Sequence, residues 1–204
     1  MAAVRPSLRV LGIDPGLTRC GVGVVDVAAD RRATLVHVSV IRTPSDAPLE
    51  ERLLAVSRGI TAALEEFGPD AVAVERVFAQ SNLKTVMGTA QASGIALALA
   101  AERGLRVGLH TTSEVKAAIT GYGSADKAQV GAMVARVLRL AEVPKPADAA
   151  DALALAICHA WRGGVDLARG SSSPTESGVS RPPTETPAQR AWRAAESAAG
   201  NRRL

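Results

Sequence analysis

Two acidic residues stand where apolar stretches of the chain stop. Asp14 ends the run LGI and is followed at once by a Pro-Gly pair, and Glu75 ends the run AVAV. Asp is a poor strand former, and a buried carboxylate without a partner is costly, so an acid at the end of a core strand needs a reason. Taken alone, Asp14 could form a turn before the Pro-Gly pair, and Glu75 could be a solvated strand end.

A second pair of acids lies in the segment PADAADALALAICHAW. Asp148 and Asp151 are three residues apart, which places both on one face of a helix, near its N-terminus. Leu155 and Cys158 continue that face, so we expect it to point inward. The alternative is that the two acids cap the helix and complement its dipole.

All four acids can meet if the strands ending at Asp14 and Glu75 are neighbours and the last helix lays its first turn across them. Four carboxylates gathered without cations would repel one another and raise their pKa values. Acidic clusters of oxygen ligands are what Mg²⁺ or Mn²⁺ requires. Two such ions about 4 Å apart can hold a phosphodiester, activate a water and stabilise the leaving oxygen. The acids therefore predict a metal site that acts on phosphate.

The elements that must position these acids are predicted from hydrophobic periodicity and from turn residues. The predicted strands cover residues 8–14, 20–28, 33–42, 71–75 and 105–110. The predicted helices cover residues 48–67, 82–103, 112–120, 126–140 and 146–162, with Gly68 past the end of the first and Ser124 as a plausible cap of the fourth. Three strands with short connections followed by αβ crossovers indicate an α/β fold: a mixed five-stranded sheet with helices on both faces.

The composition limits the class of protein. The chain has 204 residues, of which 47% are hydrophobic and 2% aromatic, enough for one domain with a core built from small aliphatic side chains. The net charge of +4 is compatible with a nucleic-acid partner but does not identify one. No signal peptide or membrane span is apparent, so we expect a soluble cytoplasmic protein. We predict a flexible N-terminus (1–7), one folded domain (8–163) and a disordered Ser/Pro-rich tail (164–204).

Cysteine and histidine do not suggest a second chemistry. Cys20 and Cys158 cannot form a disulfide framework and are expected to be reduced core residues. His37, His110 and His159 stand at no metal-ligand spacing and accompany no nucleophile motif, so structural roles are expected for all three.

Four segments, in order along the chain, resemble the RuvC family of bacterial Holliday-junction resolvases, whose fold is ribonuclease-H-like. They are LGIDPGLTRCG, AVERVFAQSN, TTSEVKAAITGYGSADKAQV and PADAADALALAICHAW. The stretch TVMGTAQASG is similar to the actinobacterial type of the family. Any one motif alone would be weak evidence, but four in the right order make the resemblance specific over residues 8–163.

The resemblance implies a complete active site. Asp14, Glu75, Asp148 and Asp151 match the family's four catalytic, metal-binding acids. The family holds two Mg²⁺ ions per subunit, accepts Mn²⁺, and leaves a 5′-phosphate and a 3′-hydroxyl. It acts as a homodimer that nicks opposed strands of a four-way DNA junction, together with the RuvA–RuvB branch-migration complex. The implied processes are DNA recombination, repair and the SOS response.

Several residues around the acids are candidate DNA contacts. Phe78 lies on a polar loop and resembles the residue that the family stacks on bases; the alternative is local packing. Lys116 and Lys127 resemble two functional lysines that would neutralise phosphate near the acids, although without the resemblance a solvated lysine is the better interpretation of each. Weaker candidates without a spacing signal are Arg76, Lys84 and Tyr122.

Two other function classes stay open from sequence. The pattern D-x-G-x-T within GIDPGLTRCG resembles a phosphate loop of actin-like kinases and ATPases, but the chain is short and has one such strand and turn. A junction-binding protein without chemistry is the other alternative. The presence of all four acids argues against it, because DNA binding alone would discard negative charge at the contact surface.

Overall fold

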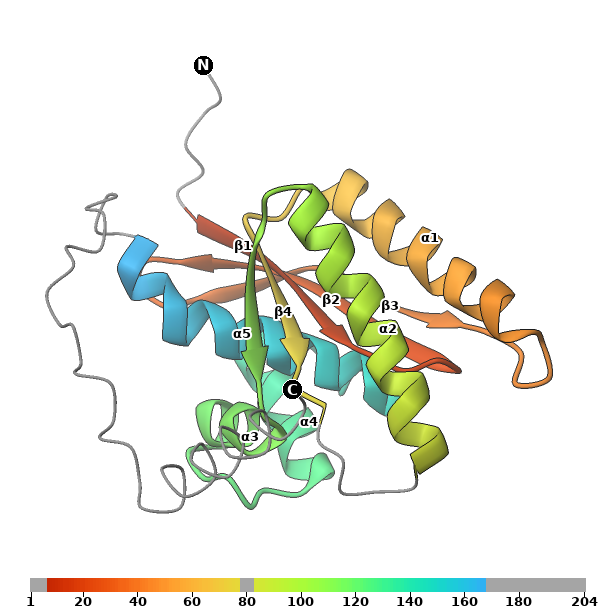
Figure 1. The fold of residues 1–204 in the computed structure, drawn as a ribbon. Helices are drawn as coiled ribbons and strands as arrows, with labels where there is room; N and C mark the ends of the chain where they lie inside the picture. Colours follow the sequence, from red (N-terminus) through yellow and green to blue (C-terminus); the bar gives the residue numbers. More distant parts are fainter. Residues whose placement is uncertain (1–6, 78–82, 168–204) are drawn as a thin grey trace, which may run out of the picture. The chain divides into compact units, whose positions relative to one another are not determined.

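The computed structural model describes residues 7–77 and 83–167, and in these ranges a five-stranded sheet is flanked by helices (Figure 1). The strands are β1 (Ser7–Asp14), β2 (Arg19–Ala28), β3 (Ala33–Arg42), β4 (Ala71–Glu75) and β5 (Arg106–His110). The helices are α1 (Leu49–Phe67), α2 (Leu83–Glu102), α3 (Thr112–Thr120), α4 (Lys127–Leu138) and α5 (Ala147–Leu167). The predicted element order and the mixed sheet are confirmed.

The strand order β3-β2-β1-β4-β5 puts β1 and β4 side by side in the middle of the sheet. β1 is antiparallel to β2, and β2 to β3, whereas β1, β4 and β5 are mutually parallel neighbours in that order. Ile13 of β1 pairs with Val74 of β4. The next residues along the two strands are Asp14 and Glu75, so both acids emerge at the same edge of the sheet.

The two faces of the sheet carry separate hydrophobic layers. Helices α1 and α2 cover one face, and α3, α4 and α5 lie on the other (Figure 1). In β1, Leu11 and Ile13 are buried against the α1–α2 layer, and Val10 belongs to the layer that contains α5. Because side chains alternate along a strand, Asp14 points to the α5 face.

Helix α5 lies directly on the strands because glycine removes side chains beneath it. A Cβ atom at Gly12 of β1 would clash with the backbone of Ala152 and Ala156, and one at Gly21 of β2 would clash with the backbone of Asp148. Gly23 stands under Leu153 in the same way. Glycine in a strand often marks such a close approach of another backbone. This contact sets the height at which α5 carries its acids over the sheet.

Some predicted boundaries and one predicted cap differ in the structure. Asp126, not Ser124, caps α4, because its carboxylate accepts a hydrogen bond from Gln129 N while the Gln129 side chain accepts one from Asp126 N. This reciprocal pair leaves Ser124 outside the cap. Helix α5 continues to Leu167, five residues beyond its predicted end, and α1 ends at a left-handed Gly68 as predicted. The predictions for 1–6 and 168–204 lie outside the described residues.

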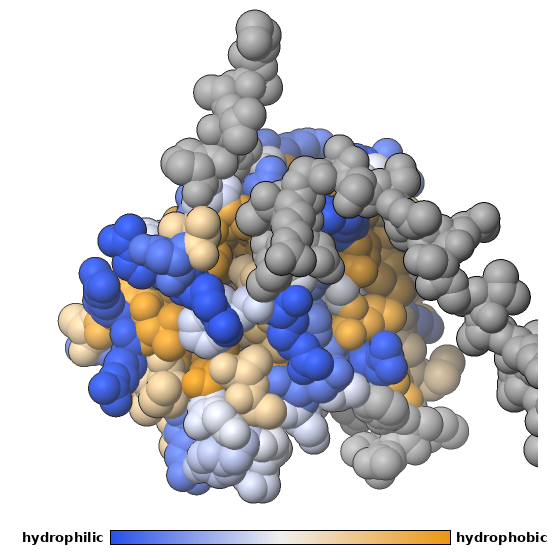
Figure 2. Space-filling view, turned by 90° about the vertical axis from the view of Figure 1, so that its left-hand side faces the viewer, coloured by the Kyte–Doolittle hydropathy of each residue, from blue (hydrophilic) through white to orange (hydrophobic). Residues whose placement is uncertain are grey.

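The described surface is mixed in character. On the face seen in Figure 2, apolar residues show in separate small areas between charged ones, as is usual for a folded domain. Cys20 and Cys158 are buried free thiols, as expected. No helix among the described residues is long and apolar enough to cross a membrane.

Candidate active site

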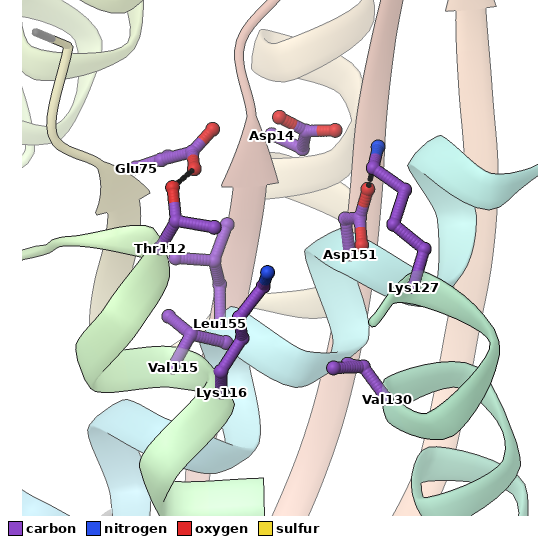
Figure 3. A pocket seen from close by; sticks show the side chains of 9 residues that line it. All are labelled: Asp14, Glu75, Thr112, Val115, Lys116, Lys127, Val130, Asp151 and Leu155. Carbon is purple, nitrogen blue, oxygen red and sulfur yellow. Dashed lines mark hydrogen bonds and ion pairs between the residues drawn. The ribbon is translucent and has the colours of Figure 1, made fainter. Parts of the chain in front are cut away.

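A pocket of about 300 Å³ opens at the edge of the sheet where β1 and β4 end (Figure 3). Its polar side chains come from both strands and from three helices, and its base is apolar. The lining residues are Asp14, Glu75, Thr112, Val115, Lys116, Lys127, Val130, Asp151 and Leu155.

The close contact of α5 with the sheet brings the four predicted acids to this edge. Asp14 pairs across the ladder with Gly21, and the backbone of Asp148 rests on Gly21. Asp151, one turn further along α5, lines the pocket together with Asp14 and Glu75. Asp148 lies at the same edge, although it does not line the pocket.

Three of the acids have their own partners. Thr112 Oγ1 donates to Glu75 Oε1 over 2.5 Å, at the first residue of α3. Lys127 Nζ, at the first residue of α4, lies 3.1 Å from Asp151 Oδ2. Arg19 Nε, at the first residue of β2, lies 3.0 Å from Asp148 Oδ2.

Asp14 is different, because its carboxylate makes no hydrogen bond or ion pair within the described residues. Burial raises the pKa of Asp14 to about 8, with further contributions from the negative charges of Glu75, Asp151 and Asp148, while Lys127 opposes the shift. A carboxylate in this environment holds its proton unless a cation neutralises the surrounding charge. Among the four acids, Asp14 is thus the one whose ionised form burial and the neighbouring charges disfavour.

Two lysines bring positive charge to the acids. Lys127 pairs with Asp151, and the negative charge of that carboxylate raises the pKa of the lysine. Lys116 extends from α3 toward the carboxylates (Figure 3). The raised pKa keeps the Lys127 ammonium group positive near neutral pH. The two lysines reduce the repulsion that an incoming phosphate would meet from the acids.

The donor set suits a hard divalent cation, because all four acids offer oxygen ligands. Within the described ranges, however, no three acidic, histidine or cysteine side chains are arranged as a ready group of metal ligands. Glu75, Asp148 and Asp151 point instead to Thr112, Arg19 and Lys127. Each carboxylate has a second oxygen, so Glu75 can keep its hydrogen bond from Thr112, whereas the positive charges on Arg19 and Lys127 compete with a bound cation for Asp148 and Asp151.

The structure describes the surroundings of two of the other predicted DNA contacts. Arg76 and Tyr122 are exposed and do not line the pocket. Lys84 lies in the first turn of α2. Phe78 falls outside the described residues.

Sequence reasoning missed Arg19 and Thr112. An arginine at the start of a strand and a threonine at the start of a helix have no distinctive spacing. It also missed that His110 and His159 meet, with Nε2 and Nδ1 3.0 Å apart. Burial lowers the pKa of His159 to about 4, with smaller contributions in the same direction from His110 and Arg106. His159 therefore stays neutral near neutral pH, in keeping with the structural role expected for it.

Because the raised pKa of Asp14 penalises its ionised form, the stability of the chain should depend on pH. Between about pH 4 and about pH 8 the folded state keeps a proton that the unfolded chain has lost, so the free energy of unfolding falls as pH rises. Asp14→Asn removes this penalty. In chelator at about pH 8 we expect the variant to melt about 2–4 °C or more above wild type, the change that corresponds to one kcal/mol in a chain of this size.

Thermal melts at about pH 5 and about pH 8 check this prediction, since the difference in melting temperature between variant and wild type should grow with pH. A divalent cation should reduce this difference in melting temperature at the higher pH, because it stabilises the ionised carboxylates of the wild type. An equal difference in melting temperature at both pH values would contradict a raised pKa at Asp14.

Comparison with known proteins gives consistent matches. A family model described as "Crossover junction endodeoxyribonuclease RuvC" matches residues 10–159. A protein of that description from Leifsonia xyli subsp. xyli is 69% identical over 192 residues, which cover 93% of this chain and 92% of that protein. Another from Frankia alni is 63% identical over 183 residues, covering 90% of this chain and 92% of that protein.

Solved structures are similar over the same region. Thermus thermophilus RuvC is 37% identical with a TM-score of 0.72, over 78% of this chain and 97% of that one. T. thermophilus RuvC in complex with Holliday junction substrate has the same identity and a TM-score of 0.74, over 78% of this chain and 96% of that one. The yeast mitochondrial Holliday junction resolvase Ydc2, at 14% identity and a TM-score of 0.56, shares the fold.

Proposed function

Because the chain belongs to the RuvC family of crossover junction endodeoxyribonucleases, we propose that its acidic pocket resolves four-way DNA junctions by hydrolysing phosphodiester bonds. The observation that carries this proposal is the convergence of Asp14, Glu75 and Asp151 in one pocket with Lys116 and Lys127. Acids alone would repel DNA, and lysines alone would bind it without chemistry. Together they suit a cation-assisted attack on phosphate.

Asp14, Glu75, Asp148 and Asp151 would hold the divalent cations. Bound there, the cations supply the Lewis acid that lowers the pKa of a water and neutralises charge on the phosphate. The water oxygen bonds to phosphorus, the bond from phosphorus to O3′ breaks, and O3′ leaves with a proton, which gives a 5′-phosphate and a 3′-hydroxyl. We propose two Mg²⁺ ions per subunit, with Mn²⁺ able to replace them, since both are hard cations that prefer oxygen ligands.

The lysines bind and stabilise rather than transfer protons. Lys116 lies on α3 with its ammonium group toward the acids, where it can stabilise negative charge that develops on the phosphoryl oxygens. Lys127 holds Asp151 and can neutralise an adjacent DNA phosphate. Phe78 is proposed to stack on a base at the crossover, with Arg76, Lys84 and Tyr122 near the flanking backbone.

Paired cuts in opposed strands need two sites related by a two-fold axis, so we propose a homodimer. Met87 of α2 and Val107 and Leu109 of β5 are large apolar side chains that stay exposed, and α2 packs against β5. An exposed apolar surface of this kind suits a second copy of the chain. The RuvA–RuvB branch-migration complex as partner and the cytoplasm as location belong to the same proposal.

The two other function classes predict different results. An actin-like phosphotransferase would hydrolyse nucleotide and ignore junctions, and a junction-binding protein would bind without cutting. The family assignment favours neither, and the acids and lysines of the pocket suit a nuclease.

Incubation of the chain with a synthetic four-way junction and Mg²⁺ tests the proposal. We expect paired nicks in strands of like polarity that ligase can reseal, and little cutting of linear duplex of the same sequence. Binding without nicks in Mg²⁺ or Mn²⁺ would support the binding protein. Nucleotide hydrolysis without junction binding would support the phosphotransferase.

Thr112 is expected to position Glu75, because its hydroxyl donates to the carboxylate at the pocket wall. Thr112→Val keeps the shape of the side chain and removes the donor. We expect nicking to slow by about 10-fold, in the range seen when residues that orient a metal ligand are changed. Single-turnover cleavage measures the effect, and junction affinity in chelator should not change. Thr112→Ser keeps the hydroxyl and should restore the rate; an equal defect in both variants would mean that the hydrogen bond is irrelevant.

A further inference from the structure

We propose that Arg19 couples cation binding to DNA binding: its guanidinium holds Asp148 in the ion-free chain and moves to a DNA phosphate when a divalent cation takes the carboxylate. The inference rests on the proposed function, because it assumes that Asp148 contributes to the cation site. It assigns to Arg19 a role that the acids and lysines of the pocket do not fill.

The ion pair between Arg19 and Asp148 is unequally exposed. Arg19 Nε lies 3.0 Å from Asp148 Oδ2, and the exposed fraction of the side chain is 56% for the arginine and 21% for the aspartate. The carboxylate is therefore held at the site, while more than half of the arginine side chain already faces solvent. Rotation of the arginine away from the acid would uncover little buried surface.

The backbone that carries Arg19 is anchored. Thr43 N donates to Thr18 O over 3.1 Å, and Thr43 Oγ1 donates to Leu17 O. Arg52 ties the same segment to α1, with Nη2 2.7 Å from Thr18 Oγ1. A long cationic side chain thus extends from a fixed point at the edge of the sheet where Asp14 and Glu75 end.

The exchange follows from charge. A cation bound by Asp148 competes with the guanidinium for the same oxygens, and the displaced guanidinium keeps its positive charge. The DNA backbone is the anion that arrives at this edge, and planar guanidinium groups bind phosphate well. By linkage, cation binding should then strengthen DNA binding, and DNA should strengthen cation binding by the same factor.

Arg19→Gln tests the exchange through binding, without cleavage. Anisotropy titrations of a labelled four-way junction are run in EDTA and in Ca²⁺, with a gel to check that the junction stays intact. In Ca²⁺ we expect the variant to bind about 10-fold more weakly than wild type, with the slope of log affinity against log salt reduced by about 1. In EDTA the junction affinities of variant and wild type should agree within about twofold. In the wild type Arg19 is then paired with Asp148 and does not bind DNA.

Arg42→Gln is the matched control. Arg42 is exposed and is the cross-strand partner of Arg19 at the same edge of the sheet. Arg42→Gln removes the same charge without breaking the pair with Asp148, so it should change the junction affinity by the same factor in EDTA and in Ca²⁺. Calorimetric titration with Ca²⁺ in the absence of DNA should show Arg19→Gln binding the ion about 2–5-fold more tightly than Arg42→Gln, since the competitor of the ion has gone.

Asp148→Asn supplies the second arm, because it should release Arg19 without any cation. In EDTA the Arg19→Gln change should cost about 10-fold in junction affinity when made in the Asp148→Asn background and little in the wild type. Arg19→Lys should retain part of the coupling. Equal effects of Arg19→Gln in EDTA and Ca²⁺, or no effect in either, would overturn the exchange. These titrations need no cleavage, so failure of the nuclease function would appear separately, as wild-type chain that binds junctions and does not nick them in Mg²⁺.

Discussion

Asp14→Asn is expected to abolish junction nicking, with a loss of more than about 100-fold in the single-turnover rate. Changing residues that merely orient a metal ligand costs about 10- to 100-fold, and Asp14 is at the centre of the proposed ligand set. Asn keeps the size of the side chain and one oxygen, and it removes the charge that a divalent cation needs. Gel analysis of cleavage in Mg²⁺ measures the rate.

The same variant should bind junctions at least as well as wild type in chelator, because Asn is uncharged at every pH and so adds no repulsion toward phosphate. It should also be the more stable protein there, since burial and three neighbouring carboxylates raise the pKa of Asp14 to about 8. Lost activity with gained stability would separate a chemical role from misfolding.

Asp30→Asn is the matched control. Asp30 lies in the exposed turn between β2 and β3, beyond the end of the ladder where Ser7 pairs with Ala28, at the opposite edge of the sheet. The substitution Asp30→Asn removes one negative charge far from the pocket, so the rate of nicking should be unchanged. Nicking by Asp14→Asn at more than a tenth of the wild-type rate would remove Asp14 from the metal site.

The sequence predicted the framework of the site because its signals there are local. Alternation of apolar residues marks each strand, and helical spacing marks each helix, so the order of elements and the neighbouring positions of β1 and β4 could be inferred. The i, i+3 spacing of Asp148 and Asp151 likewise placed both acids on the inward face of α5. Each inference needed only residues close together in the chain.

What the sequence could not supply depends on contacts between distant segments. Arg19 meets Asp148, and His110 meets His159, across spans of the chain that no periodicity connects. Ser124 and Asp126 are both good caps by type, and the capping box of Asp126 with Gln129 decides between them. The present partners of the acids follow from the packing of α3, α4 and β2 around the pocket.

The glycines beneath α5 are the clearest case. Gly12 and Gly21 interrupt strands whose other buried residues are mostly aliphatic, and a strand glycine can signal a bulge, a bend or a close backbone approach. The structure shows a close backbone approach, since a Cβ at either position would clash with the backbone of α5. The fold could be predicted from the sequence, whereas the close packing that requires glycine at these positions could not.

Gly12→Ala is accordingly expected to destabilise the chain by about 3 kcal/mol or more, a large effect for one methyl group. The added Cβ would overlap the backbone of Ala152 and Ala156, in the middle of a helix that packs across β1 and β2. Backbone atoms cannot rotate away as a side-chain tip can, so the whole helix must move. Because α5 carries Asp148 and Asp151, the same shift should reduce nicking even at temperatures where the variant is folded.

Gly94→Ala provides the opposite case. Gly94 is exposed on α2, and a Cβ there would meet nothing within 4 Å. Alanine should therefore stabilise the chain by about 0.5–1 kcal/mol through helix propensity alone. Urea titrations of both variants give the two free energies of unfolding. If Gly12→Ala were as stable as wild type, α5 would not rest on β1 as closely as the structure has it, and the placement of both helix acids over Asp14 would lose its physical basis.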